Sequence, residues 1–227
     1  MNQIWLTIDD GPSTRADDLL DFLKSKGFGA ALFCRGDYLH SKTEWGVRAI
    51  KEGYIIGNHS YDHPHFSTLT RERVREQIAK ADVIIDQVYV EADVRRSAKY
   101  FRFPYGDAGA NDETIETNQQ LLGEYGYSSL IHSPRRDWIW DVEVMDWGVD
   151  DSNVVQKLEF AKKQLGLLRL GGVLDLHDKA VNFDAGLTQN ICQSVLELGF
   201  VFYSNKDFQE QTASGGFWPF GRFLSQR

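Results

Sequence analysis

The sequence is poor in cysteine and contains no long hydrophobic run. Only Cys34 and Cys192 occur in 227 residues, and neither belongs to a Cys-x-x-Cys pair. A disulfide scaffold and a cysteine-rich zinc site are therefore excluded. Each cysteine lies in an apolar stretch, so we expect two buried free thiols, with a single long-range disulfide as the alternative. No apolar run reaches the roughly 20 residues that a membrane-spanning helix needs.

Positive charge is also scarce. Lys and Arg number 25 against 33 Asp and Glu, which gives a formal net charge of -8 and a pI of about 5.2. This balance argues against nucleic acid or an anionic membrane as the main partner. No basic and apolar leader precedes the first strand, so the sequence as it stands predicts a cytoplasmic protein. An exported protein whose leader had been removed would read the same.

Short apolar strands alternate with amphipathic helices along most of the chain. Strands are predicted at residues 4–8, 29–34, 54–59, 100–104, 127–131, 138–147, 172–177 and 200–203. Helices are predicted at residues 16–26, 45–52, 70–90, 111–123, 154–168 and 187–198. This alternation is typical of parallel β/α units, so we expect one α/β domain that closes into a barrel. The aromatic and glycine-rich tail at 209–227 belongs to the same unit or is loosely ordered.

The first predicted strand ends in two adjacent carboxylates, Asp9 and Asp10, followed by Gly11 and Pro12. Consecutive strand residues point to opposite faces, so both carboxylates can serve one point only where the chain is already turning. Such a junction suits a division of labour in which one carboxylate binds a cation and its neighbour transfers a proton. The competing interpretation is a simple polar turn.

Further polar residues stand at the ends of other predicted strands, namely His59, Arg102, Asp146 and His177. The carboxyl ends of parallel strands meet at one rim of a barrel, where the loops assemble active sites. The coincidence of these positions therefore indicates one site at that rim.

His59 and His63 are four residues apart, a spacing at which one helical turn directs both imidazoles to one ion. Pro64 would end that turn. In a chain with six histidines, such a spacing also arises by chance. Combined with a carboxylate from another strand, the pair becomes a metal site with open positions for water and substrate. His65 lies outside the spacing, and we expect it at the surface or behind the ligands.

Arg102 and His177 each need a carboxylate partner if they are buried. We expect Asp9 to be the partner of Arg102, because the contact would keep the Asp9 carboxylate ionised and hold it in one orientation, as a base requires. A structural ion pair is the alternative. A histidine held by a carboxylate stays protonated and can donate to a leaving nitrogen. Taken alone, His177 reads equally well as a core residue.

Five motifs occur in the order that resembles the polysaccharide deacetylases, the NodB-type carbohydrate esterases of family 4. They are TIDDGP (7–12), HSYDH (59–63), RFPYG (102–106), EVMDW (143–147) and LDLH (174–177). The resemblance implies a distorted (β/α)7-type barrel over residues 1–208. It also implies a carbohydrate substrate with N-acetylated amino sugars and one divalent ion, zinc or another such as Co²⁺.

The resemblance implies a role for each of the residues at the chemical centre. The metal ligands would be Asp10, His59 and His63. Asp9 would be the base that deprotonates the attacking water, and His177 would be the acid that protonates the leaving amine.

Supporting roles are implied for the residues around this centre. Arg102 would orient the base, and Asp146 would tune the acid. Tyr105 would offer its backbone N–H to the oxyanion. Trp147 would form a wall of the pocket, and Leu176 is a further candidate for contact with substrate.

The sequence departs from the family pattern at three positions. Ile8 replaces the usual Phe and Glu143 the usual Asp, and both changes are tolerable. Asp175 stands where the family commonly has a Leu that helps to enclose the acetyl methyl group, on the same strand face as His177. An ionised Asp175 would make the pocket polar and favour a protonated acid. Either the strand is locally bent, or the acyl group or the substrate differs.

Three functions are compatible with this sequence. The first is a metal-dependent hydrolase that removes N-acetyl groups from a chitin-oligomer or peptidoglycan-like glycan. The second applies the same chemistry to another C–N bond, a formamide or cyclic amide of a small or lipid-linked molecule, and Asp175 and the missing leader favour it. The third is a non-catalytic glycan-binding module, which we expect to have lost a base or a ligand. None is lost here.

Overall fold

The computed structural model describes residues 2–128, 137, 140–148, 153–168 and 171–213. The strands are β1 (Gln3–Asp9), β2 (Ala30–Cys34), β3 (Ile55–Asn58), β4 (Val142–Glu143), β5 (Gly171–His177) and β6 (Val201–Phe202). The α-helices are α1 (Ala16–Lys26), α2 (Gly36–Ser41), α3 (Thr43–Lys51), α4 (Arg71–Glu91), α5 (Asp112–Glu124), α6 (Val154–Leu165), α7 (Ala180–Asp184), α8 (Leu187–Glu197) and α9 (Asn205–Ala213). Two 3-10 turns are η1 (Phe66–Thr68) and η2 (Pro104–Gly106).

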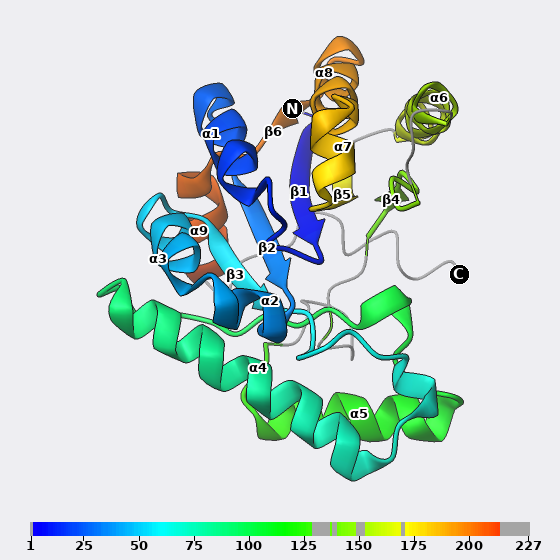
Figure 1. Ribbon diagram of the computed structural model, residues 1–227. Helices are drawn as coiled ribbons and strands as arrows, with labels where there is room; N and C mark the ends of the chain where they lie inside the picture. Colours follow the sequence, from blue (N-terminus) through cyan, green and yellow to red (C-terminus); the bar gives the residue numbers. More distant parts are fainter. Residues whose placement is uncertain (1, 129–136, 138–139, 149–152, 169–170, 214–227) are drawn as a thin grey trace.

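The strands form one parallel sheet with helices packed around it (Figure 1). Their order is β3-β2-β1-β5-β4, and β6 lies beside the start of β1. Single parallel bridges from Asn58 to Phe101 and from Phe101 to Asp137 extend the sheet beyond β3. The parallel sheet with its helices confirms the predicted α/β class. Hydrogen bonds between the described strands leave the distorted barrel open.

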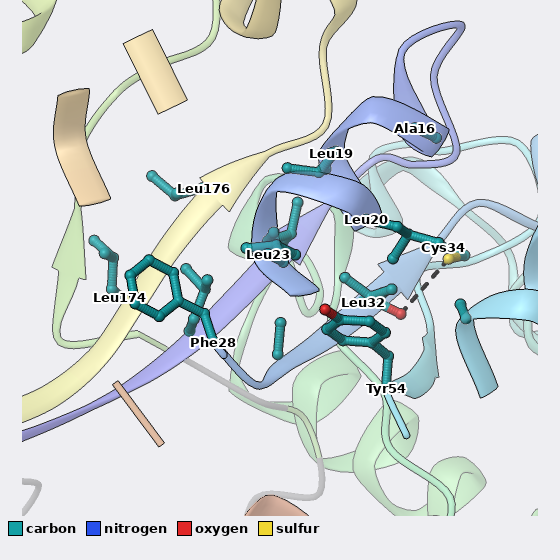
Figure 2. Close-up of a cluster of buried hydrophobic side chains, with 14 of the residues drawn as sticks. Ala16, Leu19, Leu20, Leu23, Phe28, Leu32, Cys34, Tyr54, Leu174 and Leu176 are labelled. Carbon is teal, nitrogen blue, oxygen red and sulfur yellow. Dashed lines mark hydrogen bonds between the residues drawn. The ribbon is translucent and has the colours of Figure 1, made fainter. Parts of the chain in front are cut away.

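Alternate residues of β1 belong to two different hydrophobic clusters, because successive strand side chains point to opposite faces. Ile4, Leu6 and Ile8 pack into the outer cluster under helices α1, α3 and α8, part of which is drawn in Figure 2. Trp5 lies on the inner face and packs with Phe33. The apolar run at the start of the chain therefore serves both sides of the sheet.

The inner face becomes polar toward the carboxyl ends of the strands. On β1, the apolar Trp5 is followed on this face by Thr7 and then Asp9. On the neighbouring β5, Asp175 pairs with Thr7, and His177 pairs with Asp9. The strand register alone thus places the predicted base and the predicted acid side by side.

Leu176 lies on the opposite face of β5. Its side chain is fully buried and packs with Leu174 in the outer cluster (Figure 2). Because strand side chains alternate, residues 174 and 176 face the helices while residues 175 and 177 face the interior of the barrel. This placement corrects the expectation that Leu176 contacts substrate.

Most predicted helices are present. The helices predicted at 16–26, 70–90, 111–123 and 187–198 correspond to α1, α4, α5 and α8, and their ends agree within one residue. The short helices α2, α7 and α9 were not predicted. Helix α9 continues past residue 209, where the tail was expected to begin. Phe208 packs against Trp5 with ring centroids 4.3 Å apart. Residues 214–227 of the tail lie outside the described residues.

The predicted strands in the middle of the chain are mostly shorter than expected. The strand predicted at 100–104 is reduced to the bridges of Phe101. The one predicted at 138–147 appears as β4, and residues 138–139 lie outside the described residues. Of the strand predicted at 127–131, Tyr127 forms a bridge with Lys99, while 129–131 lie outside them.

Cys34 and Cys192 are free and buried, which confirms the expected thiols.

Within the described ranges, no helix combines the length and the apolar character needed to cross a bilayer.

The start of β2 runs against the chain segment that leads into α9. Gly29 donates its N–H to the carbonyl of Tyr203 at 2.7 Å. A Cβ atom at this glycine would clash with the backbone of Ser204 and Asn205. The close approach of two backbones therefore requires glycine here.

We expect Gly29→Ala to lower the free energy of unfolding by about 1–3 kcal/mol, because neither backbone can move away without loss of packing. Chemical denaturation measures this change. Gly166→Ala is the control, because this glycine has a helical φ of -64° and a Cβ atom added to it would meet nothing nearer than the Lys162 carbonyl oxygen, at 3.4 Å. Equal stability of the two variants would contradict the close approach at Gly29.

Candidate active site

A cavity of about 520 Å³ lies at the carboxyl ends of β1, β3 and β5. Eight of the predicted site residues line it, from segments far apart in the chain: Asp9, Asp10, His59, His63, Tyr105, Trp147, Asp175 and His177. Arg102 and Asp146 are fully buried and contact the lining residues from behind. The structure thus brings together every predicted site residue except Leu176.

The two N-terminal carboxylates reach the cavity together because the chain turns between them. Asp10 has a φ of 70, in the left-handed region that Asp tolerates better than most residues. Its Oδ1 lies 2.9 Å from Nε2 of His63 and 3.5 Å from Nε2 of His59. The adjacent Asp9 points instead to Arg102.

The segment that carries the two histidines is a loop, not the predicted helical turn. Ser60 and His63 both have a φ of 66. The side-chain carbonyl of Gln77, buried on α4, accepts the N–H groups of Tyr61 and Asp62. The loop nevertheless brings Nε2 of His63 to 3.2 Å from Nε2 of His59. Gln77 was missed in the sequence because an isolated glutamine in a long helix carries no distinctive signal.

The hydrogen bond of His59 decides which of its ring nitrogens can bind a cation. Nδ1 lies 2.9 Å from the carbonyl oxygen of Arg102, and a carbonyl can only accept. In the neutral ring Nδ1 therefore carries the proton, and Nε2 presents a lone pair to Asp10. Oδ1 of Asp10 is buried and faces Nε2 of both histidines. Acceptors that face one another in this way fit a cation between them.

The donor set is of the kind that divalent metals prefer. One ligand atom from each of Asp10, His59 and His63 lies within 4.8 Å of the others. Burial raises the pKa of Asp10, but the adjacent imidazoles outweigh burial and hold that pKa well below its usual range. The group therefore offers an ionised carboxylate and two imidazoles, which is compatible with one divalent ion.

Lys179 contacts the other oxygen of the same carboxylate. Its Nζ lies 2.7 Å from Oδ2 of Asp10, so the two oxygens of Asp10 have different surroundings. The sequence analysis missed this residue, although its position two residues after His177 at a strand end was an available signal.

Arg102 lies between two carboxylates on the inner face. Its Nη1 is 2.8 Å from Oδ1 of Asp9 and 2.5 Å from Oδ1 of Asp175, and it also donates to Thr7 Oγ1 at 2.9 Å. Burial raises the pKa of Asp9 to about 6 and that of Asp175 to about 7, while the guanidinium opposes both shifts. The predicted partnership of Asp9 with Arg102 is present, and Asp175 shares it.

His177 is held by Asp146 in a fixed orientation. Oδ1 of Asp146 lies 2.6 Å from Nδ1 of His177, and Oδ2 accepts both the His177 backbone N–H at 2.9 Å and Nδ2 of Asn182 at 3.1 Å. Burial lowers the pKa of His177, but Asp146 outweighs burial and raises it to about 10. The imidazole is therefore protonated at neutral pH, with Nε2 as its second donor.

Tyr105 and Trp147 stand at the mouth of the cavity, with 61% and 45% of their surface exposed. Tyr105 has a φ of 59, and its backbone N–H makes no hydrogen bond with a described residue. Its ring stacks on His65 at a centroid distance of 4.0 Å. Trp147 donates Nε1 to Oε1 of Glu143 at 3.1 Å. The mouth thus offers aromatic surface and one available N–H.

The sequence is similar to known deacetylases. A family model described as polysaccharide deacetylase matches residues 1–127. The peptidoglycan-N-acetylglucosamine deacetylase of Bacillus cereus is 28% identical over 146 residues, which cover 64% of this chain and 46% of that protein. The chain thus spans about half the length of the curated relatives that it matches first.

Solved structures share the fold. A family 4 carbohydrate esterase from Streptomyces lividans in complex with acetate has a TM-score of 0.67 and 24% identity, over 90% of this chain and 94% of that one. A pseudoenzyme of the same esterase family from Bacillus anthracis has a TM-score of 0.65 and 20% identity, over 88% and 63% of the two chains. Because a pseudoenzyme has this fold too, activity must be inferred from the site residues.

We expect Asp146→Asn to lower the pKa of His177 from about 10 toward its ordinary value of roughly 6.5, because the charge that opposes burial is removed. NMR titration of the imidazole nitrogens measures the midpoint. The raised pKa also stabilises the folded state below pH about 6.5, and this contribution is lost as the pH rises through about 10.

The matched control is Asp107→Asn, which removes the carboxylate 3.2 Å from Nδ1 of His65 and should leave the midpoint of His177 unchanged. If Asp146→Asn also left it unchanged, the pairing with His177 would be contradicted.

Proposed function

This chain belongs to the polysaccharide deacetylase family, and on that basis we propose that it removes N-acetyl groups from amino sugars of a peptidoglycan- or chitin-like glycan. Three sets of side chains come together at one cavity, and the proposal depends on this arrangement. These are the Asp10, His59 and His63 cluster, the Asp9–Arg102 pair and the His177–Asp146 pair. We assign this activity to a domain of residues 1–208, with 209–227 as its tail.

Asp10, His59 and His63 would hold one divalent ion. When bound, such an ion supplies a Lewis acid that polarises a carbonyl and lowers the pKa of water to about 7. Two imidazoles and one carboxylate suit zinc, and Co²⁺ is the alternative. The carbonyl of Arg102 supports the assignment, because it fixes the tautomer of His59.

Asp9 is the proposed base. Its Oδ1 is held by Arg102, while Oδ2 lies 3.6 Å from Nε2 of His59 and so faces the proposed ligands. A water between this oxygen and a substrate carbonyl would lose its proton to Asp9 as it attacks. Arg102 fixes the direction of the carboxylate, which is the positioning that such a transfer requires.

His177 is the proposed acid. The amine formed when an amide bond breaks is a poor leaving group unless its nitrogen receives a proton. His177 holds that proton at neutral pH because Asp146 raises its pKa to about 10. The N–H of Tyr105 would donate to the oxyanion that develops on the carbonyl, and Trp147 would pack against a sugar ring.

The retained residues favour an enzyme over a glycan-binding module. A module that only binds glycan has no use for a base paired with Arg102 or for an acid held protonated by Asp146. The relative named as a peptidoglycan-N-acetylglucosamine deacetylase supports the amide of an amino sugar as the bond that is broken.

We expect metal removal with EDTA to abolish acetate release from N-acetylglucosamine oligomers, and Zn²⁺ or Co²⁺ to restore it, because the acidic and imidazole groups alone cannot activate water sufficiently. Acetate that is released unchanged after chelation would contradict a metal-dependent reaction. The metal content per chain, measured by mass spectrometry, shows whether chelation was complete.

We expect Asp9→Asn to lower kcat by about 10²- to 10⁴-fold, the usual contribution of a general base. Metal content should stay unchanged, since Asp10 and both histidines are retained. Asp93→Asn, at an exposed position two residues after the end of α4, is the control and should keep full activity. A fully active Asp9→Asn variant would exclude Asp9 as the base.

A further inference from the structure

The floor of the cavity is a carboxyl group. Asp175 is only 1% exposed, yet it lines the cavity from the inner face of β5. It lies two residues before His177, which places it roughly 7 Å deeper along the strand. Phe103, also 1% exposed, lines the same cavity. A methyl group that reached this floor would meet a polar surface.

The part of the substrate that reaches deepest is the acyl substituent. In an N-acylated amino sugar, the sugar ring would stay at the mouth near Trp147 and Tyr105, and the acyl end is farthest from the ring. One side-chain atom each of Asp9, Asp175 and His177 lies within 4.8 Å of the others. A carbonyl between the proposed base and acid would therefore have its substituent against Asp175.

One oxygen of the Asp175 carboxyl group is available for a hydrogen bond with the substrate. Its Oδ1 lies 2.5 Å from Arg102 Nη1 and 3.2 Å from Thr7 Oγ1. No described residue forms a hydrogen bond with Oδ2. A methyl group placed against such an oxygen would exclude water from it without offering a hydrogen bond in return, and this would weaken substrate binding. A polar substituent would restore the hydrogen bond.

A hydroxyl group suits this position better than a charged group. Burial raises the pKa of Asp175 to about 7 against the influence of Arg102, so both protonation states occur near neutral pH. A hydroxyl both donates and accepts, so it pairs with either state. An ammonium group would be repelled by Arg102, whose Nη1 lies 2.5 Å from the same carboxyl group.

We propose that Asp175 selects the acyl group, and that the enzyme hydrolyses N-hydroxyacetyl amino sugars in preference to N-acetyl ones. The inference rests on the proposed function and specifies its substrate. Water adds to the amide carbonyl and the C–N bond breaks. Asp9 takes one proton from the water, His177 gives one to the departing nitrogen, and the products are the free amine and hydroxyacetate.

The test compares two glucosamine oligomers of equal length, one N-acetylated and one N-hydroxyacetylated, with the metal-loaded enzyme. Release of free amine gives kcat/KM for each. We expect the wild-type protein to favour the hydroxyacetyl oligomer by about 10- to 100-fold, the value of one hydrogen bond to a charged group. Asp175→Leu should reverse the preference, and Asp175→Asn, which keeps a donor and an acceptor, should retain part of it.

The ratio of the two kcat/KM values separates selection from a general loss of activity. Asp175 also contacts Arg102, so its replacement should slow both reactions, and the ratio cancels this common loss. Thermal melting and metal content check that each variant is folded and loaded. Asp93→Asn, which changes an exposed acid outside the cavity lining, is the control and should leave the ratio unchanged.

Two results would overturn the inference while the proposed function stands. One is a wild-type enzyme that cleaves the acetyl oligomer as well as or better than the hydroxyacetyl oligomer. The other is a ratio that Asp175→Leu leaves unchanged. If the metal-loaded protein cleaves neither oligomer, the proposed function fails and the inference fails with it.

Discussion

The buried positive charge of Arg102 is the constraint on which the site depends. Its side chain has no exposed surface and lies against Asp9 and Asp175 at 2.8 and 2.5 Å. Without it, two carboxylates on neighbouring strands would repel each other in a medium that disfavours charge. Its backbone is equally involved, since its N–H donates to Asn58 and its carbonyl meets His59 Nδ1. One residue thus couples the proposed base to a proposed metal ligand.

The proposed acid and the proposed base differ in protonation state because a different charge lies beside each of them. His177 is protonated at neutral pH because Asp146 overcomes the effect of burial. Burial raises the pKa of Asp9 to about 6, and Arg102 opposes this rise, so Asp9 stays largely ionised at neutral pH. Strand register places these two groups side by side. Asp175 belongs to the same charge network and also forms the floor of the cavity, so the group that balances Arg102 would also meet the substrate.

Much of this arrangement could be predicted from the sequence, because the long helices have local apolar periodicity and the polar residues stand at strand ends. Features that depend on distant partners could not. Among the described residues, the strand expected around Phe101 is reduced to bridges with Asn58 and Asp137, which are distant in the sequence. The loop of His59 and His63 is shaped by Gln77 from another helix. The outward facing of Leu176, by contrast, follows from the strand alternation that places Asp175 and His177 together on the inner face.

The central claim is that Asp10, His59 and His63 converge on one cation beside Asp9. Crystals grown with zinc and measured on both sides of the zinc absorption edge test this most directly. We expect one anomalous peak at roughly 2.0–2.2 Å from Asp10 Oδ1 and from Nε2 of both histidines. A peak held by other side chains, or an Asp9 carboxylate turned away from that peak, would contradict the claim.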